Sequence, residues 1–185
     1  MTSLAGARLV SDELKALVRT IPDFPKPGIQ FRDVTTLLLD PAGLSSSVEA
    51  LAATIDGPVD LIAAIDARGF AIGGALAVRL GAGLLLVRKD GKLPGETIAE
   101  DYALEYGSDR LQMHVDACAP GARVLVVDDL IATGGTALAA VRLVRRAGGT
   151  VIGARFLIDL SSLGGADVLR ADGVDAISLM AFEGD

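Results

Sequence analysis

Two adjacent carboxylates, Asp128 and Asp129, end an apolar run and lead into a loop of glycine and threonine, in the stretch VLVVDDLIATGGT (124–136). Gly134 and Gly135 permit positive φ and carry no Cβ, so backbone N–H groups can converge on one point, as anion binding requires. The first turn of the helix that follows adds free amides, and the threonines add hydroxyl donors. The predicted phosphate-binding residues are Ala132, Thr133, Gly134, Gly135 and Thr136.

The two acids need partners of a different kind. Ionised carboxylates side by side repel each other unless cations or hydroxyl donors satisfy them. The vicinal hydroxyls of a sugar are such donors, and charge-assisted hydrogen bonds to them are strong. A ribose 5-phosphate suits both halves of the stretch. These residues alone leave open a plain alternative, a solvated Asp pair before a glycine-rich helix start. The GxxxxGK[ST] and GxGxxG motifs are absent, which argues against nucleoside-triphosphate and dinucleotide sites.

Two further segments offer cations. DARGF (66–70) ends one predicted strand and opens a helix, so its amides and the forked guanidinium of Arg68 suit phosphate oxygens. Arg88, Lys89 and Lys92 concentrate positive charge at the end of the next predicted strand. The alternatives are a surface arginine and a solvated basic turn.

The elements that position these residues alternate along the chain. Apolar runs predict strands at 59–66, 83–89, 124–129, 150–160 and 175–180, separated by helices at about 70–80, from about 135, and at about 163–171. Continuous apolar strands separated by helices predict an α/β fold, a Rossmann-like parallel sheet covered on both faces. Ligands of such sheets bind beyond the carboxyl ends of the strands, where the acids and cations described above fall.

The N-terminal part is less regular. Leu14, Leu17, Val18 and Ile21 recur at helical spacing and predict a first helix. The prolines of 22–40 predict no regular helix there, and FPKPGIQFRD (24–33) is expected to be an irregular, extended loop. Asp40 and Pro41 predict the N-cap and first turn of a second helix, with an apolar stripe through Leu44, Val48, Leu51 and Ile55.

Residues 90–115 interrupt the alternation. Their glycines and proline suggest hinges, and their alternating apolar residues predict a hairpin. A flexible lid that excludes water is the predicted role.

The composition limits the class of protein. The 185 residues predict a single domain, and no apolar span reaches membrane-crossing length. The net charge of −7 disfavours a nucleic-acid surface. The N-terminus shows no signal-peptide pattern and Cys118 stands alone, so a cytoplasmic location is expected. The single His114 cannot build a histidine metal site by itself, and a plain strand residue is expected there.

The whole pattern resembles the type I phosphoribosyltransferases. VLVVDDLIATGGT is similar to their signature for phosphoribosyl pyrophosphate (PRPP), and PDFPKPGIQFRDVTTLL, DARGF, VRKDGKLPGETIAEDYALEYG and HVDA resemble the adenine-specific members, in the same order. The resemblance spans about 21–182 and implies transfer of the 5-phosphoribosyl group of PRPP to adenine, giving AMP and pyrophosphate in purine salvage. It also implies a homodimer, an N-terminal base-binding hood within residues 1–40, and Mg²⁺ carried mainly on PRPP, with no direct protein ligand assigned.

The resemblance assigns roles to individual residues. Glu105, Arg68 and Asp129 are implied to be catalytic. The implied PRPP and AMP site comprises Asp128, Asp129, Ala132, Thr133, Gly134, Gly135, Thr136, Arg68, Arg88, Lys89 and Lys92, with part of the basic cluster able to serve a neighbouring subunit. The implied adenine site comprises Gln30, Phe31, Arg32, Glu105 and Tyr106. A non-proline cis peptide is expected near Ala67. Two alternatives stay open: a 6-oxopurine phosphoribosyltransferase, and a PRPP-sensing regulator without catalysis.

Overall fold

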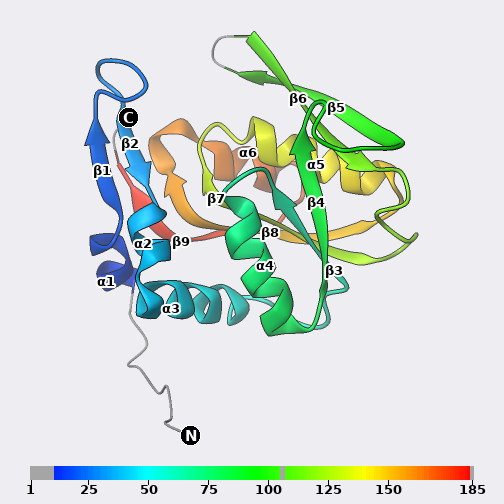
Figure 1. Cartoon of the computed structure of the whole chain (residues 1–185), viewed down its shortest axis with the longest axis horizontal. Helices are drawn as coiled ribbons and strands as arrows, with labels where there is room; N and C mark the ends of the chain where they lie inside the picture. The colour runs from blue at the N-terminus through cyan, green and yellow to red at the C-terminus, as the bar shows by residue number, and fades with distance from the viewer. Residues whose placement is uncertain (1–10, 105–106, 184–185) are drawn as a thin grey trace, which may run out of the picture.

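The computed structural model describes residues 11–104 and 107–183, and it has a central sheet with helices on both faces (Figure 1). The strands of this sheet are β3 (Leu61–Ile65), β4 (Gly83–Lys89), β5 (Thr97–Leu104), β6 (Gly107–His114), β7 (Arg123–Ile131), β8 (Thr150–Leu160) and β9 (Ala176–Phe182). Within the described residues their order is β5-β6-β4-β3-β7-β8-β9. The five strands from β4 to β9 in this order are parallel, whereas β6 and β5 are antiparallel. The predicted α/β class is confirmed.

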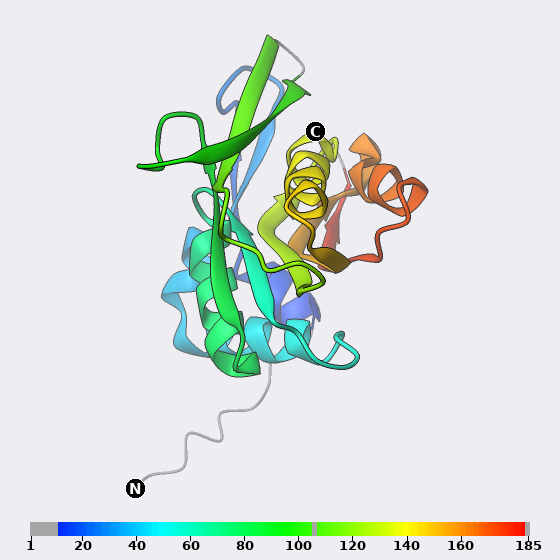
Figure 2. The same cartoon turned by 90° about the vertical axis from the view of Figure 1, so that its right-hand side faces the viewer.

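The helices divide between the two faces of the sheet. They are α1 (Ser11–Ala16), α2 (Thr35–Leu39), α3 (Pro41–Ala52), α4 (Gly69–Leu80), α5 (Gly135–Arg146) and α6 (Gly165–Ala171), with a 3₁₀ turn η1 (Ser161–Leu163). α1 to α4 share one apolar core, and α5 and α6 share the other (Figure 2). Adjacent strand residues point to opposite faces, so Phe156 of β8 packs in the α5 core and Leu157 in the other.

Several predicted boundaries are confirmed. β4, β8 and the start of α5 lie where the sequence predicts them. Asp40 caps α3, because its Oδ1 accepts a hydrogen bond of 2.7 Å from the N–H of Gly43. Gly81 ends α4 with a φ of 68°.

The N-terminal prediction is wrong in four places. The predicted first helix stops at Ala16, and residues 19–22 form strand β1 (Arg19–Pro22) instead. β1 pairs antiparallel with β2 (Gln30–Asp33), which replaces part of the predicted irregular loop. α2 lies within the stretch where prolines were expected to prevent a helix, since the last proline, Pro27, precedes it by eight residues. Helix α3 ends at Ala52, so Ile55, which was predicted to continue its apolar stripe, lies beyond the helix.

Two antiparallel units extend beyond the carboxyl edge of the parallel strands, β1–β2 from one end of the sheet and β5–β6 from the other (Figures 1 and 2). β5 and β6 pair from Thr97–His114 to Leu104–Gly107, as the alternating pattern predicts. The role of this hairpin as a lid stays a prediction. His114 ends β6, and its Nε2 lies 2.8 Å from the carbonyl oxygen of Pro94. No helix among the described residues is both long and apolar enough to span a membrane.

Candidate functional site

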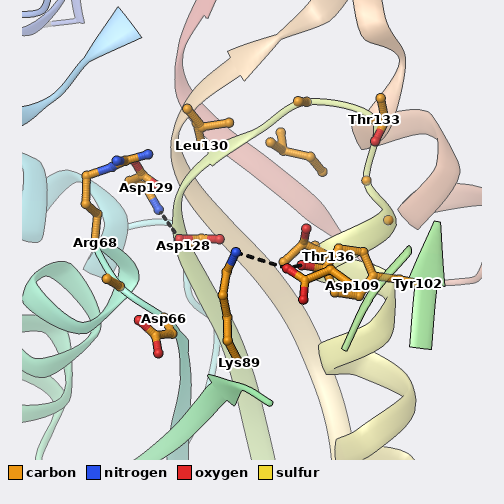
Figure 3. Close-up of a pocket in the computed structure, with 16 residues that line it drawn as sticks. Asp66, Arg68, Lys89, Tyr102, Asp109, Asp128, Asp129, Leu130, Thr133 and Thr136 are labelled. Atoms are coloured by element: carbon orange, nitrogen blue, oxygen red, sulfur yellow. Dashed lines mark hydrogen bonds and ion pairs between the residues drawn. The ribbon is translucent and has the colours of Figure 1, made fainter. Parts of the chain in front are cut away.

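A cavity of about 400 Å³ opens at the carboxyl edge of β3, β4 and β7 (Figure 3). Its lining residues come from four parts of the chain: Asp66, Ala67, Arg68, Lys89, Tyr102, Asp109, Asp128, Asp129, Leu130, Ile131, Ala132, Thr133, Gly134, Gly135, Thr136 and Ala137. The structure thus brings together the acid pair, the glycine-threonine loop, Arg68 and Lys89, which the sequence analysis singled out from separate segments.

The acid pair stands near the end of β7. Asp129 is buried, and its Oδ2 accepts a hydrogen bond from Nε of Arg68. Asp128 is half-buried, and its Oδ1 accepts a hydrogen bond of 2.8 Å from the N–H of Asp129. Burial, and then the neighbouring Asp129 carboxylate, raise the pKa of Asp128 well above its usual range. The pair is therefore an acceptor site with one cation beside it, suited to hydroxyl donors.

The loop that follows is held by its backbone. Gly134 has a φ of 85°, and α5 begins at the next residue. The N–H of Gly165 donates to the carbonyl of Ala132 at 2.9 Å, and a Cβ on Gly165 would lie 2.2 Å from that oxygen. The main chain at the start of α6 therefore contacts the main chain of the loop. Free amides at the start of α5 border the cavity, which favours an anion.

The DARGF segment (66–70) borders the cavity on the side facing the loop 132–136. Its Asp66–Ala67 peptide is cis, as expected near Ala67. Arg68 is the N-cap of α4, and its guanidinium also lies over the ring of Phe31, 5.6 Å from the centroid. A Cβ on Gly69 would lie 2.9 Å from Oδ1 of Asp128, so only glycine lets α4 start this close to the acids.

Of the three predicted basic residues, Arg88, Lys89 and Lys92, one reaches the cavity and two do not. Lys89 borders the cavity. Arg88 donates from Nε to Oδ2 of Asp66 at 3.0 Å and from Nη1 to the carbonyl of Lys92 at 3.1 Å. Neither Arg88 nor Lys92 is among the cavity's lining residues, and Lys92 is exposed.

The hairpin supplies two lining residues that the sequence analysis did not single out as site residues, Tyr102 and Asp109. Nζ of Lys89 lies 3.0 Å from Oδ2 of Asp109, and the Tyr102 hydroxyl donates to the same oxygen at 3.0 Å. Hydrogen bonding with Lys89 lowers the pKa of Asp109, and the same bond raises the pKa of Lys89. No local motif marks these residues, because their place depends on how β5 and β6 fold back. Leu130 and Ile131, which also line the cavity, look in the sequence like ordinary apolar residues.

The predicted adenine-site residues lie apart from the cavity's lining. Gln30, Phe31 and Arg32 belong to β2, and Gln30 is opposite Pro22, which has no N–H to donate to it. Phe31 meets Phe24 edge to face at 5.2 Å between centroids. Arg32 donates to Oγ1 of Thr20 at 2.6 Å and stacks on Phe182. Arg68 is the contact that joins Phe31 to the cavity. The predicted base-contacting residues Glu105 and Tyr106 lie outside the described residues.

A metal could find only oxygen ligands in this cavity. Among residues 11–104 and 107–183 no three His, Cys, Asp or Glu side chains are grouped to hold one. The carboxylates that border the cavity belong to Asp66, Asp109, Asp128 and Asp129. Hard oxygen donors without a closed cage suit Mg²⁺ that arrives with its own waters and substrate phosphates.

Comparison with known proteins gives a consistent result. The sequence model of the phosphoribosyl transferase domain family matches residues 39–177 of this chain. An adenine phosphoribosyltransferase from Maricaulis maris (strain MCS10) is 54% identical over 173 residues, which make up 93% of this chain and 99% of that protein. The crystal structure of adenine phosphoribosyltransferase from Thermoanaerobacter pseudethanolicus matches with a TM-score of 0.89 and 49% identity, over 94% of this chain and 100% of that one.

A more distant enzyme shares the same fold. Adenine phosphoribosyltransferase from Saccharomyces cerevisiae, crystallised with an imino-altritol bisphosphate and adenine, has a TM-score of 0.86 and 34% identity, over 91% of this chain and 97% of that one. The chain belongs to the phosphoribosyl transferase domain family, on the branch formed by the adenine phosphoribosyltransferases.

Proposed function

We propose that this protein transfers the 5-phosphoribosyl group of PRPP to adenine and releases AMP and pyrophosphate, a reaction of purine salvage. One observation carries the proposal: a single cavity joins a carboxylate pair, a phosphate-type loop and two cations. PRPP presents the matching groups, namely two ribose hydroxyls, a 5′-phosphate and a pyrophosphate.

Each part of PRPP has a partner in this arrangement. The 5′-phosphate binds the loop 132–136, where free amides and threonine hydroxyls donate. The ribose hydroxyls donate to Asp128 and Asp129. The pyrophosphate at C1′ lies between Arg68 and Lys89, which border the other side of the cavity.

The reaction exchanges one bond at C1′ for another. N9 of adenine forms a bond to C1′ while the bond from C1′ to the pyrophosphate oxygen breaks, and its electron pair leaves with pyrophosphate. Arg68 and Lys89 stabilise the negative charge that develops on the leaving group. Asp128 and Asp129 hold the ribose in place as C1′ becomes positively charged. The Asp66 carboxylate borders the cavity, so it would lie near Mg²⁺ carried on PRPP oxygens, and the ion would supply further positive charge.

Adenine is read, in this proposal, by the β2 segment. The backbone C=O and N–H of Gln30 pair with N6 and N1, Phe31 packs on the ring, and Arg32 lies nearby. Pro22 leaves the Gln30 carbonyl without a donor from the facing residue, which supports this assignment. Glu105 holds the imidazole edge of the base or takes its proton, and Tyr106 covers it.

A homodimer is also proposed. Leu84 and Leu86 are exposed on one face of β4, and Leu84 approaches Gly74 of α4, one turn from the exposed Val78. This apolar patch of Val78, Leu84 and Leu86 is suited to a second subunit. The single cysteine is consistent with a cytoplasmic location.

The decisive assay measures AMP formation from adenine and PRPP, with and without Mg²⁺, in parallel with guanine, hypoxanthine and xanthine. We expect Mg²⁺-dependent turnover of adenine alone. Preference for a 6-oxopurine would overturn the base assignment. Tight PRPP binding without turnover of any purine would show that the protein is a PRPP sensor and not an enzyme.

A further inference from the structure

We propose that Asp109, on the hairpin, competes with substrate for Lys89 and thereby sets the affinity for the pyrophosphate end of PRPP. This inference rests on the proposed function. Lys89 is one of the two cations bordering the cavity, and its ammonium group is already engaged by the Asp109 carboxylate at 3.0 Å (Figure 3). Pyrophosphate must take over this contact before Lys89 can stabilise it.

The Asp109 carboxylate is held at the cavity by more than one bond. The Tyr102 hydroxyl donates to its Oδ2 at 3.0 Å, and the N–H of Arg110 donates to its Oδ1 at 2.8 Å. Tyr102 is itself buried, at 8% exposed, so the donor that fixes the carboxylate has little freedom. Asp109 is therefore part of the cavity wall.

The same network reaches the other end of the substrate site. Tyr102 has one hydroxyl proton, which it gives to Asp109, so its bond with Thr136 requires the Thr136 hydroxyl to donate. The main competition is nevertheless at Lys89, which carries the full charge.

The hairpin cannot withdraw Asp109 easily, because α5 holds its base. Arg146 donates to the carbonyl of Ala99 at 2.5 Å and to Oε2 of Glu100 at 3.1 Å. Arg142 lies 3.5 Å from the same carboxylate. With the base of β5 anchored, substrate binding breaks the contact between Lys89 and Asp109 and places a polyanion near a carboxylate. Both effects weaken binding.

The test is calorimetric titration of the full chain with Mg²⁺-pyrophosphate, Mg²⁺-PRPP and AMP. Asp109→Asn keeps the shape and removes the charge. We expect it to bind pyrophosphate and PRPP roughly five- to tenfold more tightly, since one partly exposed ion pair no longer has to break and a nearby repulsion is lost. AMP, which lacks the pyrophosphate, is expected to bind as it does to the unaltered protein.

Asp101→Asn is the matched control. Asp101 lies on the same hairpin, pairs with Arg110 at 2.6 Å, and does not line the cavity, so this variant changes the net charge equally. It is expected to leave all three affinities unchanged. Asp109→Ala provides a second variant, and thermal unfolding verifies that each protein is folded.

Unchanged or weaker pyrophosphate binding by both Asp109 variants would overturn the inference and make Asp109 a support for Lys89. Equal tightening by Asp101→Asn would overturn it as well, since the effect would then be one of net charge. Failure of the proposed function looks different: the unaltered protein itself would bind neither PRPP nor AMP.

Discussion

Asp128 and Asp129 are neighbours with different surroundings. Asp129 is paired with Arg68, which compensates the charge of its buried carboxylate. Asp128 accepts a backbone hydrogen bond from Asp129, and desolvation of its carboxyl group, followed by the neighbouring Asp129 carboxylate, raises its pKa. Ionisation of Asp128 in this site is therefore unfavourable, and hydroxyl donors from a ribose would offset part of that cost.

Asp128→Asn should change stability and activity in opposite directions, with a higher melting temperature and slower formation of AMP. Between the ordinary pKa of 3.8 and its raised value, the folded protein keeps a proton on Asp128 that the unfolded chain has lost. The free energy of unfolding therefore falls as pH rises through this window, and asparagine removes that fall. We expect the variant to gain in melting temperature, relative to the unaltered protein, from pH 4 to pH 7.

The same variant should form AMP roughly 10- to 100-fold more slowly, because charge-assisted hydrogen bonds to the ribose are lost. Thermal unfolding against pH and steady-state kinetics measure the two effects. A variant that melts lower at pH 7 in proportion to its lost activity would make Asp128 structural.

Among single residues, the sequence predicts those site residues that lie close together along the chain. The acids and the loop follow one another within 124–136, so their proximity needs no knowledge of the fold. Tyr102 and Asp109 were missed as site residues because they reach Lys89 only through antiparallel pairing, at separations of 13 and 20 residues. The sequence analysis also grouped Lys92 with Lys89 at the site. Lys92 is instead exposed, because it lies in the turn after β4.

At the scale of elements, prediction succeeded where glycine punctuates long apolar runs, as at β4, α4 and β8. It failed before residue 40. Leu14 and Val18 are both buried, so a helical period fits them, yet the chain leaves the helix between them. β1 exists because β2 pairs with it, and a partner eight residues further on leaves no trace in the periodicity of 14–21.

The junction of β2 and α2 depends on Asp33. Its Oδ1 accepts from the N–H of Thr35 at 3.0 Å, and its Oδ2 accepts from Arg19 of β1. Hydrogen bonding from the Thr35 hydroxyl, and then from Arg19, lowers the pKa of Asp33 to about 2. The stability that the charged form provides is therefore present above pH 3.8 and is lost as pH falls toward 2.

Asp33→Asn is accordingly expected to lower the free energy of unfolding at pH 7 by about 1–3 kcal/mol, the usual worth of hydrogen bonds to a charged group. Denaturant titrations at pH 7 and at the lowest pH where both proteins fold measure the difference, which should shrink with acid. Asp56→Asn, at an exposed loop residue, serves as the control. A difference that is independent of pH would show that the charge of Asp33 contributes nothing.

The contact between the start of α6 and the loop 132–136 gives a second prediction at the scale of elements. A Cβ on Gly165 would lie 2.6 Å from the N–H nitrogen of Gly134, so Gly165→Ala must displace the loop. We expect the KM for PRPP to rise by roughly tenfold to a hundredfold, since small misplacements of binding groups have effects of this size. Gly74→Ala, whose Cβ would meet nothing closer than 3.9 Å, is the control. An unchanged KM would mean that the loop tolerates the displacement.

At the scale of the molecule, the cavity unites segments from both sides of the sheet. Its acid pair comes from β7, its cations come from the start of α4 and from β4, and the hairpin contributes Tyr102 and Asp109. The net charge of −7 repels a polyanion at long range, so attraction depends on the few local cations. In our proposals, the pairing of Lys89 and the number of cations that reach the cavity therefore decide how tightly the polyanion binds.

A further cation belongs to the face that we propose for dimerisation. Residues on one face of a strand alternate, so Arg88 shares its face of β4 with Leu84 and Leu86, and it lies where that face meets the carboxyl edge. A second subunit seated on the patch of Val78, Leu84 and Leu86 would therefore be next to Arg88. In this proposal part of the basic cluster acts across the interface, which would account for the absence of Arg88 and Lys92 from the lining of the cavity in a single chain.

Leu86→Glu places a charge in this patch and should give a monomer, because a carboxylate buried without a partner at an interface is strongly unfavourable. Val168→Glu is the matched control, since Val168 is equally exposed, at 41% against 39%, but lies on α6 at the opposite face of the sheet. Light scattering gives the oligomeric state, and kinetics give the KM for PRPP. We expect only Leu86→Glu to dissociate and to lose PRPP affinity, by roughly tenfold, as one charge-assisted contact from Arg88 is removed. A monomer with an unchanged KM would confine the basic cluster to its own subunit, and an intact dimer would place the interface elsewhere.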